Sequence, residues 1–355
     1  MIHTTIKEIQ KNILPVDEKS MQAAREHWMA IAKPLFSLGK LEETVIRIAG
    51  MKRSPEYELG KKGLVIMCAD NGVVAEGVTQ TGQEVTAVVA DNFTKGKAST
   101  CLMAEVAGVD LFPVDIGMAV DVPSVTVPEY KIAYGAGNIA KEPAMTREEA
   151  WRAIEVGISI ARELKRKGYG ILLTGEMSIG NTTTSSALAS VFLGEPVEMM
   201  TGRGAGLSSE GLERKTGVIR RAISLHQPNP SDPLDVLAKV GGLDIAGLCG
   251  VFLGGALEGI PVVVDGFISA VAALTAVRMV PTVSEYLLSS HISKEPAGQM
   301  LLEELGLSAM IDAQMSLGEG SGAVAMIPLL EMGLQVYRRM PTFEQAEIEQ
   351  YEVLK

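Results

Sequence analysis

The sequence predicts an α/β protein with a parallel β-sheet covered by helices, and two observations lead to this fold class. Short, continuous apolar runs alternate with longer segments of helical periodicity, and such runs suit strands that are buried on both faces. Several of the runs lead into an acidic residue and then a loop. Because parallel sheets bind ligands at the carboxyl ends of their strands, we expect the functional groups to gather there.

The predicted elements follow one another along the chain. Strands are expected at 63–70, 110–118, 169–177, 259–267 and 285–293. Helices are expected at 17–33, 40–51, 83–107, 146–168 and 320–339, and the last residues, 342–355, form an acidic helix or a frayed end. Thr146 and Glu149 have the spacing of a capping box, which places a helix start there. The alternation of strands and helices predicts right-handed βαβ units.

Composition excludes several classes of function. The chain of 355 residues has a formal charge of −11 and no basic stripe, so nucleic-acid binding is not expected. Its three cysteines are far apart, which predicts buried free thiols rather than disulfides or a zinc site, and no histidine pair has metal-ligand spacing. The N-terminus has no apolar signal region and no apolar stretch is long enough to span a bilayer. We expect a cytoplasmic protein that needs no metal and no membrane.

The segment TGEMSIGNTTTSSAL, residues 174–188, has the outline of a phosphate loop. Gly175 and Gly180 are five apart, and Asn181 stands where a nucleoside-triphosphate loop carries lysine. Small residues let backbone N–H groups approach an anion, and the helix that follows adds its positive end. Asn181 cannot neutralise charge, so a phosphate monoester is favoured over Mg-ATP. The alternative is a Gly-rich turn between strand and helix that binds no ligand.

Two further segments carry candidate chemistry. In TGRGAGLSSEGLERK, residues 201–215, a loop leads to a helix on which Lys215 could supply a cation to a phosphate; the alternative is a solvated charge. In LGEGSGAVAM, residues 317–326, Glu319 lies between glycines at the start of an apolar helix. An apolar environment raises the pKa of a carboxyl group, as a general base requires, whereas the alternative is a first-turn glutamate that favours the helix dipole.

These segments, together with PVVVDGF (261–267), EPAMT (142–146) and ADNGVVAEGVTQTGQEVTA (69–87), resemble motifs of one enzyme family. This is the nicotinate-nucleotide:dimethylbenzimidazole phosphoribosyltransferase family of cobalamin biosynthesis. The matching motifs run in the family's order from about residue 65 to 335. The resemblance implies a Rossmann-like parallel sheet flanked by helices, spanning 61–335, and a small helical domain built from 1–60 and 336–355. It also implies a homodimer and no cofactor.

The resemblance implies a reaction and a role for each matching residue. Family members transfer phosphoribose from nicotinate mononucleotide to a benzimidazole nitrogen, with inversion at the anomeric carbon. Glu319 matches the base that takes the imidazole proton, and Glu176 matches a second acid. The positions that match the phosphate and nucleotide site are Gly180, Asn181, Thr182, Thr183, Gly204, Lys215, Asp265 and Ser293. The positions expected to line the base site are Thr81, Val89, Met177 and Leu317.

The sequence also departs from the family's pattern. Asn71 stands where members often have histidine after the aspartate, and Val89 falls where some members carry glutamine. An apolar wall fits methylated or methoxylated benzimidazoles and could admit phenols, so the identity of the base stays open. Three alternatives remain at this point: a relative that activates other lower-ligand bases, alone or with a partner chain; a nucleotide-binding paralogue without activity; and an NTP-hydrolysing protein, which Asn181 disfavours.

Overall fold

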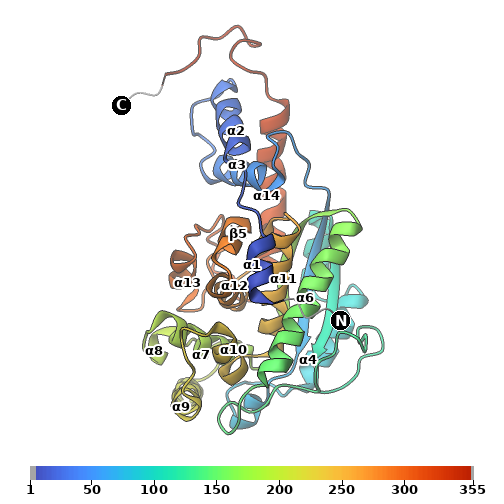
Figure 1. Ribbon diagram of the computed structural model, residues 1–355, viewed down its shortest axis with the longest axis vertical. Helices are drawn as coiled ribbons and strands as arrows, with labels where there is room; N and C mark the ends of the chain where they lie inside the picture. Colours follow the sequence, from blue (N-terminus) through green and yellow to red (C-terminus); the bar gives the residue numbers. More distant parts are fainter. Residues whose placement is uncertain (1–4, 353–355) are drawn as a thin grey trace.

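The computed structural model describes residues 5–352 and has a five-stranded, all-parallel sheet at its centre (Figure 1). The strands are β1 Lys61–Ala69, β2 Val109–Gly117, β3 Tyr169–Met177, β4 Val262–Val264 and β5 Leu287–Ser289, in the order β2-β1-β3-β4-β5. The predicted α/β class and all five predicted strands are confirmed. The last two strands are shorter than expected, because only their central residues pair with a neighbour.

The strand order places a switch point between β1 and β3. The chain passes from β1 to β2 on one side and then returns across β1 to β3 on the other side. Because the connections between parallel strands are right-handed, the connections in the two directions lie on opposite faces of the sheet. Such a reversal opens a crevice at the carboxyl ends of the strands. Residues 63–69 of β1 and 171–177 of β3 are buried, as expected for strands covered on both faces.

Helices cover the sheet. They are α1 Ile6–Asn12, α2 Glu18–Ala30, α3 Lys40–Lys52, α4 Glu84–Thr94, α5 Ser99–Ala107, α6 Arg147–Arg166, α7 Asn181–Leu193, α8 Val197–Met200, α9 Ser209–His226, α10 Pro233–Val240, α11 Leu243–Leu257, α12 Phe267–Met279, α13 Gly298–Glu304 and α14 Ser321–Arg339, with 3₁₀ turns at Gly72–Glu76 and Pro281–Tyr286. Helices α6 and α11 pack closely because Gly157 meets Gly250: a Cβ on Gly157 would lie 2.1 Å from the Gly247 carbonyl oxygen.

Two predicted helical segments differ in the structure. The expected helix 83–107 is two helices, α4 and α5, because Gly96 has a left-handed φ of 67° that ends the first one. The tail from 342 to 352 contains no helix; the remaining residues of the predicted 342–355 segment lie outside the described residues. The backbone of this tail bonds to the end of α2, where Phe343 N–H donates to Ala30 O at 2.8 Å.

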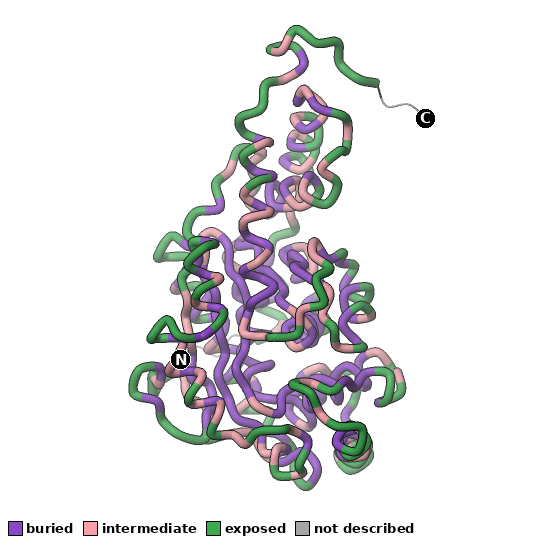
Figure 2. The backbone as a smooth tube through the Cα atoms, turned by 180° about the vertical axis from the view of Figure 1, so that it is seen from behind, coloured by how far each residue is buried: buried purple, intermediate pink, exposed green. Residues whose placement is uncertain are grey.

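A helical extension stands away from the sheet. Helices α2 and α3 pack on the C-terminal part of α14, and buried residues concentrate in the larger body beside them (Figures 1 and 2). Helix α1, in contrast, contacts α11 on the larger body. Helix α14 is continuous through the predicted boundary at residues 335 and 336. The division of the chain into two domains stays a prediction.

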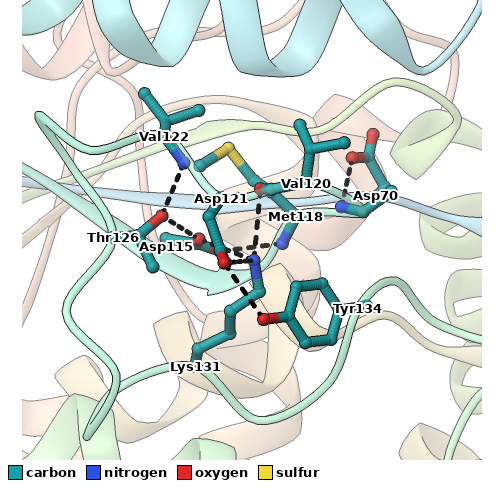
Figure 3. A network of polar contacts seen from close by, with 10 residues as sticks. Asp70, Asp115, Met118, Val120, Asp121, Val122, Thr126, Lys131 and Tyr134 are labelled. Carbon is teal, nitrogen blue, oxygen red and sulfur yellow. Dashed lines mark hydrogen bonds and ion pairs between the residues drawn. The ribbon is translucent and has the colours of Figure 1, made fainter.

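The irregular segment between β2 and α6 is held by one lysine (Figure 3). Lys131 Nζ lies 3.0 Å from Asp115 Oδ2 and 2.8 Å from Asp121 Oδ1. It also donates to the Val120 carbonyl oxygen at 3.1 Å, and Thr126 donates to Asp115 at 2.6 Å. This network fixes the loop to the carboxyl end of β2, where secondary structure provides no hydrogen bonds.

Candidate active site

A cavity of about 320 Å³ opens at the carboxyl ends of β1, β3, β4 and β5, within the size range of small-molecule sites. Its walls come from segments 78–89, 175–182, 203–207, 265–269, 291–295 and 316–319. This is the edge that the strand order and the loop-terminated apolar runs predict. Most of the predicted site residues line this cavity: Thr81, Val89, Glu176, Met177, Gly180, Asn181, Thr182, Gly204, Asp265, Ser293, Leu317 and Glu319.

Thr183 is one of two predicted residues that do not line the cavity. It is fully buried, and its Oγ1 has no hydrogen-bond partner among residues 5–352. Its backbone N–H donates to the Gly180 carbonyl oxygen at 2.9 Å. Successive residues of a helix point about 100° apart, so Thr182 reaches the cavity while Thr183 turns into the protein. The structure does not bring Thr183 to the expected phosphate position.

Lys215 is the second predicted site residue that does not line the cavity, and it lies directly behind the cavity wall. Its side chain is fully buried in α9, and Nζ donates to Thr182 Oγ1 at 2.8 Å and to the Gly202 carbonyl oxygen at 3.1 Å. A Cβ on Gly204 would lie 3.0 Å from Thr182 Oγ1 and 3.6 Å from Lys215 Nζ. Thr182, Gly204 and Lys215 therefore converge from three segments. Burial lowers the pKa of Lys215 to about 8, and Glu295 opposes this shift.

Glu176 is the second-last residue of β3 and shares the side-chain amide of Asn181 with a second acid. The side chain of Asn181 donates to Glu176 and to Asp244 Oδ2, the latter at 3.2 Å. Burial, together with the nearby charge of Asp244, raises the pKa of Glu176 to about 8. Burial raises the pKa of Asp244 to about 6. Sequence reasoning missed Asp244, although an acid at the start of the apolar segment 243–257 was a usable signal.

Glu319 lies in a run of three left-handed residues. Its φ is 60°, between Gly318 at 80° and Gly320 at 82°. This turn fits tightly against β3, because a Cβ on Gly175 would lie 2.8 Å from the Glu319 carbonyl group, and one on Gly318 would lie 2.6 Å from Glu176 Oε1. Burial raises the pKa of Glu319, and the nearby Thr100 opposes this shift. The glycines of the two motifs thus bring both acids to one place.

Asp265 follows β4 and faces the start of α14. Its Oδ1 accepts the Ala323 N–H at 2.9 Å and lies 4.0 Å from His291 Nδ1. Burial raises the pKa of Asp265 to about 7, and the N–H groups at the start of α14 oppose this shift. His291 also lines the cavity.

One side of the cavity is apolar. Val85 and Val89 of α4 contribute to it together with Met177, Leu317 and Phe267. Phe267 and Val85 were missed in the sequence because one ends an apolar strand pattern and the other lies within an ordinary helix pattern. Asn71 is not part of the wall. Its side chain donates to Ser178 Oγ at 2.7 Å, so it supports the loop after β3 from behind.

Residues 5–352 contain no group of three or more histidine, cysteine, aspartate or glutamate side chains arranged to hold a metal ion. None of their helices has the length and apolar character needed to cross a bilayer. All three cysteines are free thiols, and two of them, Cys68 and Cys249, are buried.

The fold and the cavity define an α/β protein with a ligand site at the switch point of a parallel sheet. The chain matches the family described as "Phosphoribosyltransferase" over residues 13–348. It is 46% identical over 352 residues to the nicotinate-nucleotide--dimethylbenzimidazole phosphoribosyltransferase of Acetivibrio thermocellus, covering 99% of both chains. The enzyme of the same name from Ruminiclostridium cellulolyticum is 46% identical over 351 residues, covering 99% of this chain and 100% of that one.

Solved structures agree with these matches. The crystal structure of CobT from Thermus thermophilus superposes with a TM-score of 0.88 at 38% sequence identity. The match covers 94% of this chain and 100% of the Thermus chain. The protein belongs to the nicotinate-nucleotide:dimethylbenzimidazole phosphoribosyltransferase family.

Proposed function

We propose that the protein transfers phosphoribose from nicotinate mononucleotide to 5,6-dimethylbenzimidazole or a related base. The products are α-ribazole 5′-phosphate and nicotinate, for assembly of the cobalamin nucleotide loop. The observation that carries this proposal is the cavity itself. It combines a cluster of buried carboxyl groups, a polar corner with a lysine directly behind it, and apolar lining residues.

The polar corner suits the phosphate of the nucleotide. The start of α7 at Asn181 offers the positive end of a helix, and Thr182 adds a hydroxyl group. Lys215 supplies a positive charge one hydrogen bond behind Thr182. A lysine from a different helix thus takes the place of the lysine that the loop lacks.

Glu319 suits the role of general base. As one imidazole nitrogen forms a bond to C1′, the proton on the other nitrogen passes to the Glu319 carboxylate. The bond from C1′ to the pyridinium nitrogen breaks, and its electron pair leaves with nicotinate. Burial raises the pKa of Glu319, as a general base requires, and Glu319 lines the cavity.

Glu176 suits the stabilisation of positive charge on the ribose. With its pKa raised to about 8, Glu176 holds a proton at neutral pH when no cation is nearby. A cationic pyridinium or ribose nearby favours the ionised carboxyl group, since an opposite charge lowers a carboxyl pKa. Glu176 then stabilises the charge that develops as the leaving group departs.

The apolar wall suits the incoming base. Val89, Met177 and Leu317 provide a surface for an aromatic ring with methyl substituents.

We also propose that the active form is a cytoplasmic homodimer. Val88, Leu102 and Val106, on α4 and α5, are 60%, 63% and 85% exposed, and burying them between two copies would favour association.

The test is release of nicotinate. The purified protein is incubated with nicotinate mononucleotide and a panel of benzimidazoles and phenols, and the products are separated by chromatography. Turnover with benzimidazoles supports the proposal. Turnover with phenols alone, or only with a partner chain added, indicates a relative that activates other bases. Nucleotide binding without turnover on any base indicates a paralogue without activity.

A further inference from the structure

Glu295 occupies the corner proposed for the phosphate. It follows β5, and its side chain lines the cavity beside Thr182 and Gly204. The Gly204 N–H, one of the donors in that corner, donates to Glu295 Oε1 at 3.0 Å. A negatively charged group of this protein therefore already holds a donor that the phosphate of a nucleotide would use.

The carboxyl group of Glu295 is only partly satisfied in this position. Its Oε2 is buried and has no hydrogen-bond partner among residues 5–352. The oxygen packs directly against Gly202, where an added Cβ would lie 2.1 Å from it. A buried acceptor without a donor costs free energy, so this contact is easier to break than a fully bonded one.

Glu295 also interacts with the buried cation of the corner. It favours the charged form of Lys215, whose pKa burial lowers. Glu295 thus supplies both the negative charge and the hydrogen-bond acceptor that a bound anion would supply. A phosphate at Gly204 and the Glu295 carboxylate would compete for the same N–H group and repel each other.

We propose that Glu295 is an internal competitor for the phosphate corner and thereby determines its specificity. It excludes free inorganic phosphate, which offers no more than the contacts that Glu295 already makes. A phosphate carried on a ribose displaces it, because the ribose and its ring add binding energy elsewhere in the cavity. This inference rests on the proposed position of the nucleotide phosphate, but not on the transfer reaction.

The test compares Glu295→Gln with a matched control. The glutamine keeps the size of the side chain and removes its charge. Glu303→Gln makes the same change of charge on the exposed face of α13. Isothermal titration calorimetry measures the affinity of each protein for inorganic phosphate and for ribose 5-phosphate.

We expect Glu295→Gln to bind inorganic phosphate roughly 10-fold more tightly than the unchanged protein, the scale of a charge-assisted hydrogen bond. The preference for ribose 5-phosphate over inorganic phosphate should fall, and Glu303→Gln should behave as the unchanged protein. Unchanged or weaker phosphate binding by Glu295→Gln, or an equal gain in Glu303→Gln, overturns the proposal. Because neither ligand is turned over, the result is independent of the transferase assay.

A measurement on the unchanged protein covers the case in which Glu295→Gln fails to fold. A crystal structure with ribose 5-phosphate should show the phosphate bonded to Gly204 N–H and the Glu295 side chain moved away. If Glu295 still accepts that hydrogen bond while the phosphate is bound, the proposal is wrong.

Discussion

The side-chain amide of Asn181 lies 3.2 Å from Asp244 Oδ2, so a residue of the cavity wall is held by an acid outside the cavity. The same amide donates to Glu176. Asp244 therefore acts on Glu176 in two ways: it orients Asn181, and its charge raises the pKa of Glu176.

Replacing Asp244 by asparagine should lower the pKa of Glu176. The substitution removes a negative charge that disfavours ionisation of Glu176, and the new side chain can still accept from Asn181. The limb of the pH profile of kcat/KM that reports Glu176 should move to lower pH. Asp312→Asn, an exposed control, should leave the profile in place. A loss of kcat/KM with no movement of that limb would indicate a purely structural role.

Glu319→Ala should reduce kcat by about 100-fold or more, the scale of a positioned general base. Glu319→Gln keeps the shape of the side chain but cannot take a proton, so it should lose a similar factor. Steady-state release of nicotinate measures both. Near-normal turnover by either variant would remove Glu319 from the role of base.

Glu319→Gly should be more stable than Glu319→Ala by about 1 kcal/mol. The φ of 60° at this position is costly for a residue with a Cβ and free of that cost for glycine. Urea unfolding of the two inactive variants gives the difference directly. Equal stability would mean that residues 318–320 relax when the side chain is removed.

Lys215→Met should raise KM for nicotinate mononucleotide by roughly 10-fold, because it removes the charge behind Thr182. In the unchanged protein, kcat/KM should fall as the pH rises through about 8, where Lys215 loses its proton. That fall should be absent from Lys215→Met. Thr182→Val is a matched test of the bridging hydroxyl group, and a normal KM in both variants would place the phosphate elsewhere.

Lys131→Met should destabilise the fold by about 3 kcal/mol. The substitution leaves the carboxyl group of Asp115, which is fully buried, without its cation. The control is Lys167→Met, which breaks an exposed ion pair with Glu163 and should change the free energy of unfolding by about 0.5 kcal/mol or less. Similar losses in the two variants would mean that the network in Figure 3 adds little stability.

The sequence by itself determined the fold class, the order of the strands along the chain and the edge at which the site forms. Apolar runs and their periodicity are local properties, and the carboxyl ends of parallel strands meet at one edge whatever the details of packing. The sequence also drew attention to the glycines of the GEMSIG and LGEG segments, but it assigned the first set to the approach of an anion; the structure shows that Gly175 lets the backbone of residue 319 come close.

Only the tertiary structure decided which side chains share the site. Thr183 turned away, since neighbouring helix residues point in different directions, and the helix 83–107 broke at Gly96. Asp244 accepts a hydrogen bond from Asn181, 63 residues away in the sequence. Glu295 accepts one from Gly204, 91 residues away. No local pattern encodes such contacts, because they depend on how distant segments pack against each other and not on the residues beside them.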